Sequence, residues 1–254
     1  MSDMYMLSDL HCHILPGIDD GARDENMSGA LLASEEAQSV KQIIFTPHFY
    51  ADRMVPEAFT EARDQAFGRM KKTIEDLGLS AMRGAEVRMQ EKLLGMDLSG
   101  LGMGDTHYLL LEWPFSSYPF WGEDIVYKLL DMGIRPVFAH IERYEYFFRN
   151  EENLEYFRNL GCLFQVNADT VLNPRQQDQV FHLIRDGYLH IVASDAHNTG
   201  GRPSNLKKAL DCISDHLGQG TARWLNGNAH HIFHDMEVEI LTRDLVNNIK
   251  KEGR

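Results

Sequence analysis

The sequence has few cysteines and no long hydrophobic run. Its 254 residues include only three cysteines, at widely spaced positions, so we expect no disulfide framework. The longest apolar runs are a few residues, whereas a membrane-spanning helix needs about 20. The N-terminal residues lack the basic and apolar regions of a signal peptide. These absences predict a cytoplasmic protein that is not inserted in a membrane.

Positive charge is also scarce. Lys and Arg total 25 against 38 Asp and Glu, which gives a formal net charge of −13. Proteins that bind nucleic acid broadly usually carry a basic patch or stripe, so we expect no nucleic-acid partner. No linker, repeat or low-complexity segment interrupts the chain, and single α/β barrels often have this length. We therefore expect one domain over residues 1–254, with the oligomeric state left open.

Short apolar segments that end in polar residues alternate with amphipathic helical segments. The seven apolar segments are residues 4–13, 42–48, 82–87, 108–113, 135–140, 162–168 and 190–197. Near-continuous apolar strands between helices indicate a parallel sheet covered on both faces. The pattern predicts an α/β fold, a distorted seven-stranded (β/α)7 barrel of the TIM type. After residue 203 we expect only helices, the last over 236–251. A doubly wound open sheet is the alternative, but its Gly-rich phosphate loop is missing.

Ligand-type side chains gather where these predicted strands end. The first segment contains "HCH", and residues two apart on a strand point to the same face. In a barrel the carboxyl ends of the strands meet, so such residues should lie together. The candidates are His11, His13, Asp20, His48, Glu86, Glu112, His140, Asp195 and His197.

Each candidate alone has a plainer interpretation. The His pair could lie on a half-exposed strand, His48 could cap a turn, and Glu86 could be a solvated loop carboxylate. Seven strand ends seldom carry so many ligand types by accident, and the joint pattern predicts a metal site. The imidazole and carboxylate set, without thiolate, suits Mn²⁺, Fe²⁺ or Zn²⁺ in a hydrolytic cluster.

The number and charge of the candidates point to several ions and an anionic substrate. Nine ligands are too many for one ion and suit two or three. Four of the candidates are carboxylates, with a charge of −4, whereas three divalent ions carry +6. The excess positive charge favours a phosphate dianion. Multi-metal sites stabilise the attacking and leaving oxygens of a phosphoryl displacement and supply a hydroxide near neutral pH.

The order of the motifs then identifies a family. The segments "DLHCHILPGIDDGA", "TPH", "GAEV", "LLLEWP", "PVFAHIERY", "QVNA" and "ASDAHNTGGRP" resemble the polymerase-and-histidinol-phosphatase (PHP) superfamily. The resemblance spans residues 7 to about 235. It is strongest to the bacterial manganese-dependent tyrosine phosphatases of capsule and exopolysaccharide clusters. The family implies a distorted seven-stranded barrel, three metal ions, and hydrolysis of phosphotyrosine on the tail of a partner tyrosine kinase by a metal-bound hydroxide.

The resemblance also implies roles for individual residues. His11, His13, Glu86 and Asp195 would hold one ion. Glu86 would bridge to a second ion, shared with Glu112 and His140, and Asp20, His48 and His197 would hold the third. The ions would be Mn²⁺, with Fe²⁺, Zn²⁺ or Mg²⁺ as alternatives. Arg143 and Arg202 match the phosphate-binding arginines and would act in substrate binding and catalysis.

Some positions leave the match open. The ligand of the "DDG" motif is assigned to Asp20, with Asp19 as its helper or as a turn residue. Ser204 stands where the family often has a second Pro, with little expected consequence. Arg143 could instead pair with its neighbour Glu142. The remaining histidines are expected on the surface or on helix faces: His107, His182, His190, His216, His230, His231 and His234.

Other functions would require other residues or tolerate the loss of some. A PHP phosphatase of a small phosphoester such as histidinol phosphate is the alternative. A metal-dependent amidohydrolase generally needs a bridging lysine, which no strand end offers. A cysteine phosphatase needs Cys-x5-Arg, and no cysteine has Arg six residues on, so Cys12 is expected in packing. A non-enzymatic scaffold for a kinase would tolerate missing ligands, and none is missing.

Overall fold

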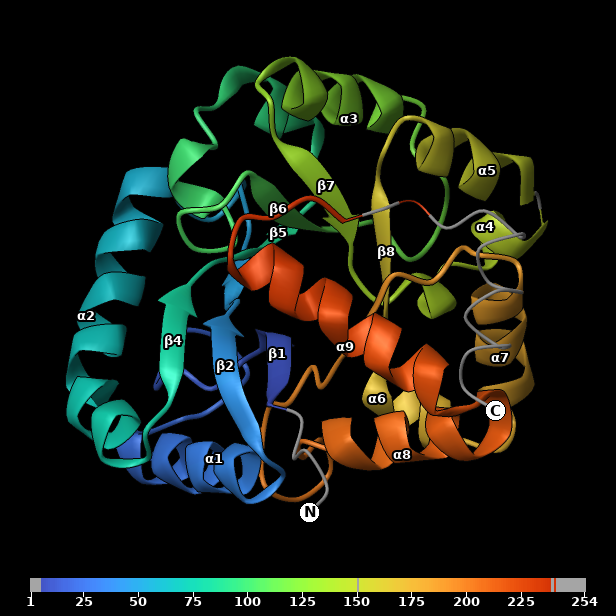
Figure 1. The fold of residues 1–254 in the computed structure, drawn as a ribbon. Coiled ribbons are helices and arrows are strands. Elements are labelled where there is room, and N and C mark those ends of the chain that lie inside the picture. The colour runs from blue at the N-terminus through green and yellow to red at the C-terminus, as the bar shows by residue number, and fades with distance from the viewer. Residues whose placement is uncertain (1–5, 150, 239, 241–254) are drawn as a thin grey trace.

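Parallel strands surrounded by helices form the protein (Figure 1). The structure is a computed structural model and describes residues 6–149, 151–238 and 240. Its strands are β1 (Leu7–Cys12), β2 (Val40–Phe45), β3 (His48–Phe49), β4 (Ser80–Arg83), β5 (Glu86–Arg88), β6 (Tyr108–Glu112), β7 (Arg135–Phe138), β8 (Leu163–Asn167) and β9 (Ile191–Ala193).

Helices connect most of these strands and lie on the outside (Figure 1). The α-helices are α1 (Glu25–Ala37), α2 (Pro56–Asp76), α3 (Gly122–Asp131), α4 (Glu145–Arg149), α5 (Glu151–Asn159), α6 (Ala168–Leu172), α7 (Gln177–Arg185), α8 (Leu206–Leu217) and α9 (Gln219–Phe233). Short 3₁₀ helices are η1 (Glu91–Gly95), η2 (Ser99–Leu101) and η3 (Ile141–Arg143). No helix in the described part of the chain has the length and apolar character needed to cross a membrane.

The strands form two parallel sheets that curl around a common interior. The smaller sheet has the order β1-β2-β4, and the larger has the order β3-β5-β6-β7-β8-β9. Beyond β9, the Asp195 N–H donates to the His11 carbonyl at 2.8 Å, and the His13 N–H donates to the Ala196 carbonyl at 2.8 Å. These bonds bring the end of the larger sheet against the first strand of the smaller one.

The predicted parallel α/β architecture is confirmed, whereas the count of seven strands is not. Two of the predicted segments are each divided into two strands. Residues 42–48 divide into β2 and β3 at Thr46–Pro47, where proline has no N–H to donate to a ladder. Residues 82–87 divide into β4 and β5 at Gly84, where a Cβ would lie 3.0 Å from Ile44 Cγ2. The short strands β3 and β5 begin with two candidate ligands, His48 and Glu86.

Apolar side chains lie on both faces of the curled sheet. Along β6, Leu109 and Leu111 pack outward against the helix layer, whereas Tyr108 and Leu110 point into the interior. This alternation is the period of two expected of a strand buried on both faces. Helix α9 crosses the sheet at one end (Figure 1) and adds Ala229, Ile232 and Phe233 to the interior cluster.

The prediction of a helix over residues 236–251 is wrong for its first residues. Met236, Glu237 and Val238 follow α9 without helical structure, because the Tyr108 hydroxyl donates to the Met236 carbonyl and the Arg135 guanidinium donates to the Val238 carbonyl. The carbonyls of Met236 and Val238 therefore accept hydrogen bonds from side chains, where in a helix they would accept them from backbone N–H groups. Apart from Ile240, the rest of that predicted helix lies outside the described residues.

Candidate metal centre

All nine candidate ligands lie at one end of the curled sheet. His11 is the penultimate residue of β1, and His13 and Asp20 follow this strand. His48 is the first residue of β3, and Glu86 is the first residue of β5. The two strands pair, and these two residues lie opposite each other. Glu112 ends β6, His140 follows β7, and Asp195 and His197 follow β9. Parallel strands bring their carboxyl ends to the same edge, and His48 and Glu86 follow the carboxyl ends of β2 and β4, which explains why residues distant in sequence meet here.

The backbone adopts unusual conformations to place some of these side chains. His140 and Asp195 have φ angles of 33° and 52°, in the left-handed region that residues other than glycine rarely occupy. Such conformations cost about 1–3 kcal/mol each and persist where the surroundings enforce them. Gly21 allows the loop after β1 to fold back on His13, because a Cβ there would lie 2.0 Å from the His13 carbonyl oxygen.

Glu86 lies at the centre of the cluster. Its Oε2 is 3.3 Å from His11 Nε2, 3.2 Å from His13 Nε2 and 2.9 Å from His48 Nδ1. Its Oε1 is 2.7 Å from His140 Nε2. The Glu86 side chain is buried. One carboxylate therefore contacts four imidazoles, which is the geometry of a group that could bridge two ions.

Two further carboxylates extend the cluster on opposite sides. Asp195 Oδ1 lies 3.5 Å from His11 Nε2 and 3.4 Å from His13 Nε2. Asp20 is exposed, and its Oδ1 lies 3.5 Å from both His48 Nε2 and His197 Nε2. The site thus runs from a buried end at Glu86 to a solvent-facing end at Asp20.

Four overlapping groups of these side chains could each hold an ion. They are His13, Asp20, His48 and His197; His11, His13 and Asp195; His11, Glu86 and His140; and His48, Glu86 and Glu112. The groups share His11, His13, His48 and Glu86. They overlap with the three sets that the family resemblance implies but differ in detail: His13 joins the outermost group, Glu86 is absent from the group with Asp195, and Glu112 lies with His48 instead of His140.

The second ring nitrogen of most of these histidines is held by another group. The Nδ1 atoms of His11, His13 and His140 lie 3.1 Å from Gln165 Oε1, 2.6 Å from Asp19 Oδ2 and 3.1 Å from the Tyr144 hydroxyl. His197 Nδ1 lies 2.8 Å from the Asp195 carbonyl oxygen. An Nδ1–H donated to these oxygens leaves the Nε2 lone pair free, as in histidines that bind metal.

Burial and opposite charges shift the pKa values of the site in both directions. Burial alone would raise the pKa of Glu86, but the charges of His11 and His48 hold it well below its ordinary value. Burial would lower the pKa of His13, but the Asp19 carboxylate raises it well above the ordinary value. Burial and the charge of His13 lower the pKa of His197 to about 4. The opposite shifts of Glu86 and His13 follow from the attraction between carboxylate and imidazolium groups at short distance.

The donor set fits divalent cations. Glu86 Oε2, His48 Nδ1 and His197 Nε2 are buried and make no hydrogen bond of ordinary geometry within the described residues. Such atoms are costly to bury unless a partner satisfies them. A divalent ion would replace the protons on the imidazoles and pair with these oxygens and nitrogens.

Arg143 and Arg202 meet at the edge of the cluster. Their Nη2 atoms lie 3.1 Å and 2.7 Å from Asp195 Oδ2, and both side chains are partly exposed. Glu142 does not pair with Arg143. It is buried and accepts hydrogen bonds from the Asn167 N–H and the Thr170 hydroxyl. Two guanidinium groups therefore converge beside the candidate ligands, where they could also reach an anion.

Several residues that support the site were not assigned roles from the sequence. Gln165 accepts from the His140 N–H at 2.7 Å and donates to Asn167 Oδ1, and Asn167 donates to Asp195 Oδ2 at 2.6 Å. Both lie on the same face of β8, two residues apart. Polar side chains with this period in an otherwise apolar strand are the signal that could have identified them. Asp19, expected as a helper, also accepts from the His48 N–H at 2.9 Å.

The structure also shows where Cys12 and the histidines without a ligand motif lie. His190 is completely buried and lies just before β9, so its prediction as a histidine on the surface or on a helix face was wrong. Its Nδ1 accepts from the Phe164 N–H at 3.0 Å, an interaction that only the pairing of β8 with β9 brings about. The other six histidines without a ligand motif are at least partly exposed. Cys12 is buried in the outer apolar layer, as predicted.

This fold and this site define a metal-dependent hydrolase: a curled parallel sheet with imidazoles and carboxylates at the carboxyl ends of its strands. The chain belongs to the capsular polysaccharide synthesis family CpsB/CapC, whose model matches residues 7–234. This family membership confirms the resemblance identified from the sequence.

Relatives agree with this assignment along most of the chain. The chain is 31% identical to the tyrosine-protein phosphatase YwqE of Bacillus subtilis over 238 residues, which covers 91% of this chain and 92% of that protein. It is 29% identical to the tyrosine-protein phosphatase CpsB of Streptococcus pneumoniae, covering 85% and 93% of the two chains. A crystal structure from work on YwqE and CpsB, described as unique metal-dependent tyrosine phosphatases, matches with a TM-score of 0.81 at 30% identity, covering 92% of this chain and 97% of that one.

Proposed function

We propose that this chain is a metal-dependent protein-tyrosine phosphatase. The observation that carries the proposal is the convergence of nine imidazole and carboxylate side chains, with Glu86 at their centre, beside two arginines. The names of the relatives, which are tyrosine phosphatases of the same family, support the substrate class. The reaction adds water across the ester bond. The bond between phosphorus and the tyrosyl oxygen breaks, a bond between phosphorus and the water oxygen forms, and a proton from water ends on the tyrosyl oxygen. The products are the tyrosine side chain and inorganic phosphate.

The nine candidates are proposed as ligands in three sets, as the resemblance implies. His11, His13, Glu86 and Asp195 form one set, and Glu86, Glu112 and His140 form the second. Asp20, His48 and His197 form the third. Divalent ions in these sets would act as Lewis acids and lower the pKa of water. We propose Mn²⁺, with Fe²⁺, Zn²⁺ or Mg²⁺ as alternatives, because all donors are nitrogen or oxygen.

The residues of the chain itself then have distinct tasks. Asp19, Gln165 and Tyr144 fix ring orientations, so that Nε2 atoms face the centre. Arg143 and Arg202 would bind the non-bridging phosphoryl oxygens with forked N–H donors. Negative charge grows on these oxygens as the reaction proceeds, so the two guanidinium groups would bind the transition state more tightly than the ground state.

The same proposal covers the fold, the substrate protein and the location. The two sheets, linked through β9 and β1, support a distorted barrel in one domain, with seven strands if β2 and β3, and likewise β4 and β5, are each counted as one interrupted strand. The family description, capsular polysaccharide synthesis, supports a phosphotyrosine-bearing tail of a bacterial tyrosine kinase as the substrate. The scarcity of cysteine supports a cytoplasmic location.

Two measurements test the proposal: the preference between substrates and the dependence of turnover on metal. Purified protein is loaded with Mn²⁺ and assayed on a phosphotyrosine peptide and on histidinol phosphate, with and without a chelator. We expect metal-dependent turnover of the peptide, with kcat/KM above that for histidinol phosphate, and two to three bound ions by elemental analysis. Full activity without bound metal, or a preference for histidinol phosphate, would overturn the proposal.

A further inference from the structure

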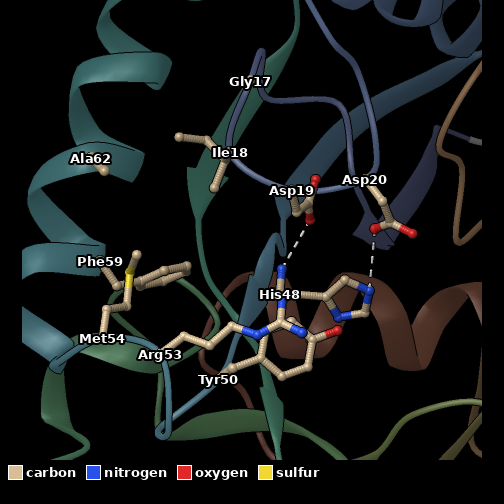
Figure 2. Close-up of a pocket in the computed structure, with 10 residues that line it drawn as sticks. All are labelled: Gly17, Ile18, Asp19, Asp20, His48, Tyr50, Arg53, Met54, Phe59 and Ala62. Atoms are coloured by element: carbon tan, nitrogen blue, oxygen red, sulfur yellow. Dashed lines mark hydrogen bonds and ion pairs between the residues drawn. The ribbon is translucent and has the colours of Figure 1, made fainter.

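A cavity of about 600 Å³ opens beside the outer part of the candidate metal centre. Asp20 and His48 border it on the side of the metal centre, and Ile18 and Ala62 lie across from them (Figure 2). Ala62 belongs to α2, so the cavity lies between this helix and the loop after β1. Pockets for small molecules commonly measure about 300–1,000 Å³, so this one could hold a side chain together with its phosphate.

The cavity is polar at one end and apolar at the other. Met54 and Phe59 lie away from the ligands, on the apolar side (Figure 2). A phosphotyrosine side chain has the same division, with a dianion at one end and an aromatic ring behind it. An aliphatic phosphoester would leave the apolar part of the cavity unfilled.

Arg53 is at the rim of this cavity. Its guanidinium carbon lies 4.2 Å from the centroid of the Tyr50 ring, where a cation–π contact holds it in place. The side chain is exposed and makes no ion pair with an acidic side chain among the described residues. It offers a forked donor to an anionic group of a ligand.

We propose that this cavity is the subsite for the tyrosyl ring of the substrate, and that Arg53 binds an acidic residue next to the phosphotyrosine. The inference rests on the proposed function and adds a determinant of specificity to it. The ring enters between Ile18 and Met54, the phosphate faces His48 and Asp20, and the peptide chain passes Arg53. The subsite thereby selects aryl over alkyl phosphoesters and acidic over neutral sequences.

Phe115 offers a second aromatic surface near the ligands, but its ring is already engaged. It is stacked on His140 and Tyr144, and the Arg88 guanidinium carbon lies 4.7 Å from its centroid. A substrate ring would have to displace one of these groups. The open cavity is therefore the better site for the ring.

The test uses the Mn²⁺-loaded protein and three peptides of equal length. One carries phosphotyrosine beside Glu, one carries phosphotyrosine beside Gln, and one carries phosphoserine beside Glu. The variants are Arg53→Ala, the cavity-filling Ala62→Phe and the milder Ala62→Leu. Lys72→Ala, on the exposed part of the same helix α2, removes the same charge elsewhere and serves as the control. Metal content is measured on every preparation.

We expect Arg53→Ala to lower the ratio of kcat/KM for the Glu and Gln phosphotyrosine peptides about fivefold. Ala62→Phe should lower the ratio for phosphotyrosine over phosphoserine about tenfold, with a smaller effect for Ala62→Leu. Lys72→Ala should change neither ratio. If the wild type hydrolyses no phosphotyrosine peptide, the proposed function itself fails.

Three other outcomes would overturn the subsite while leaving the phosphatase intact. The ratios could stay constant in the Arg53 and Ala62 variants. Arg53→Ala could reduce turnover of all three peptides equally, which would mean that it contacts the phosphate. Phe115→Ala could change the aryl preference while both Ala62 variants do not, which would place the ring against Phe115.

Discussion

The two ends of the curled sheet differ in almost every physical respect. At the amino ends of the strands, α9 packs Ile232 and Phe233 against Leu10 and Ile191 in a buried apolar cluster. Some polar groups buried there bond to each other, as the Ser8 hydroxyl does to Gln42 at 2.6 Å, whereas His190 Nε2 has no hydrogen-bond partner within the described residues. At the carboxyl ends, charged groups crowd around Glu86, and several of their atoms have no hydrogen-bond partner in the part of the chain that the structure describes.

This difference shows how one sheet can be stable at one end and reactive at the other. Apolar burial at the amino ends of the strands, the closed end that α9 covers, stabilises the fold. At the carboxyl ends of the strands, the open end of the sheet, residues with left-handed backbone conformations and closely spaced charges cost free energy. The rest of the fold holds them in place. Changes at the open end should therefore affect chemistry more than stability, and changes at the closed end should do the reverse.

The largest expected effect comes from removing the centre of the open end. Glu86→Ala should lower kcat/KM about a thousandfold and reduce bound metal, because the carboxylate shared by four histidines is lost. Elemental analysis and kinetics on a phosphotyrosine peptide measure both effects. Glu91→Ala, which removes an exposed carboxylate in η1, is the matched control and should change neither. Near-normal activity of Glu86→Ala would remove Glu86 from the centre.

Arg143→Ala and Arg202→Ala test substrate binding separately from metal binding. Each should lower kcat/KM by about 30- to 1,000-fold while metal content stays full, because each loses about 2–4 kcal/mol of transition-state binding. The double variant should fall below either single one. Arg149→Ala, at an exposed position of α4, is the control. If both single variants retain turnover, the metal ions alone hold the phosphate.

Ile232→Ala should produce the opposite result at the closed end. Ile232 is completely buried in the interior cluster, and its truncation leaves a cavity that costs about 2–4 kcal/mol of unfolding free energy. The kcat/KM per folded molecule should stay close to wild type. Denaturant titration and kinetics measure the two quantities, with Met236→Ala, at an exposed side chain, as the control. A large loss of kcat/KM with little loss of stability would contradict the division between the ends.

His190 gives the smallest effect and makes the closed end sensitive to acid. Burial, together with the charges of Arg135 and Arg158, lowers its pKa from 6.5 to about 3. The unfolded chain therefore binds a proton that the folded chain does not, and stability falls as the pH drops from about 6.5 towards 3. His190→Asn keeps an acceptor for the Phe164 N–H without the titration. When the pH falls from 7 to 5, the unfolding free energy of the His190→Asn variant should decrease by about 1–2 kcal/mol less than that of the wild type. Equal losses in both proteins would show that His190 does not titrate with folding.

The local pattern of the sequence determined the elements and the residue types of the site. Apolar segments of strand length, each followed by a ligand-type residue, predicted a parallel α/β fold and gathered the candidates at one end. That inference succeeds because the carboxyl ends of parallel strands meet regardless of the details of packing. The family resemblance added the substrate class and the proposed roles of the two arginines, which the residue pattern does not supply.

Only the tertiary structure decided how these residues are held. Gln165 and Tyr144 fix histidine rings that are distant in sequence, and His190 is buried because β8 and β9 pair. The breaks at Pro47 and Gly84 turn two predicted strands into four, which no local period reveals. The cavity under Arg53 exists only because α2 packs beside the loop after β1. Such contacts depend on the distances between elements, and a linear sequence fixes those only through the packing of the whole chain.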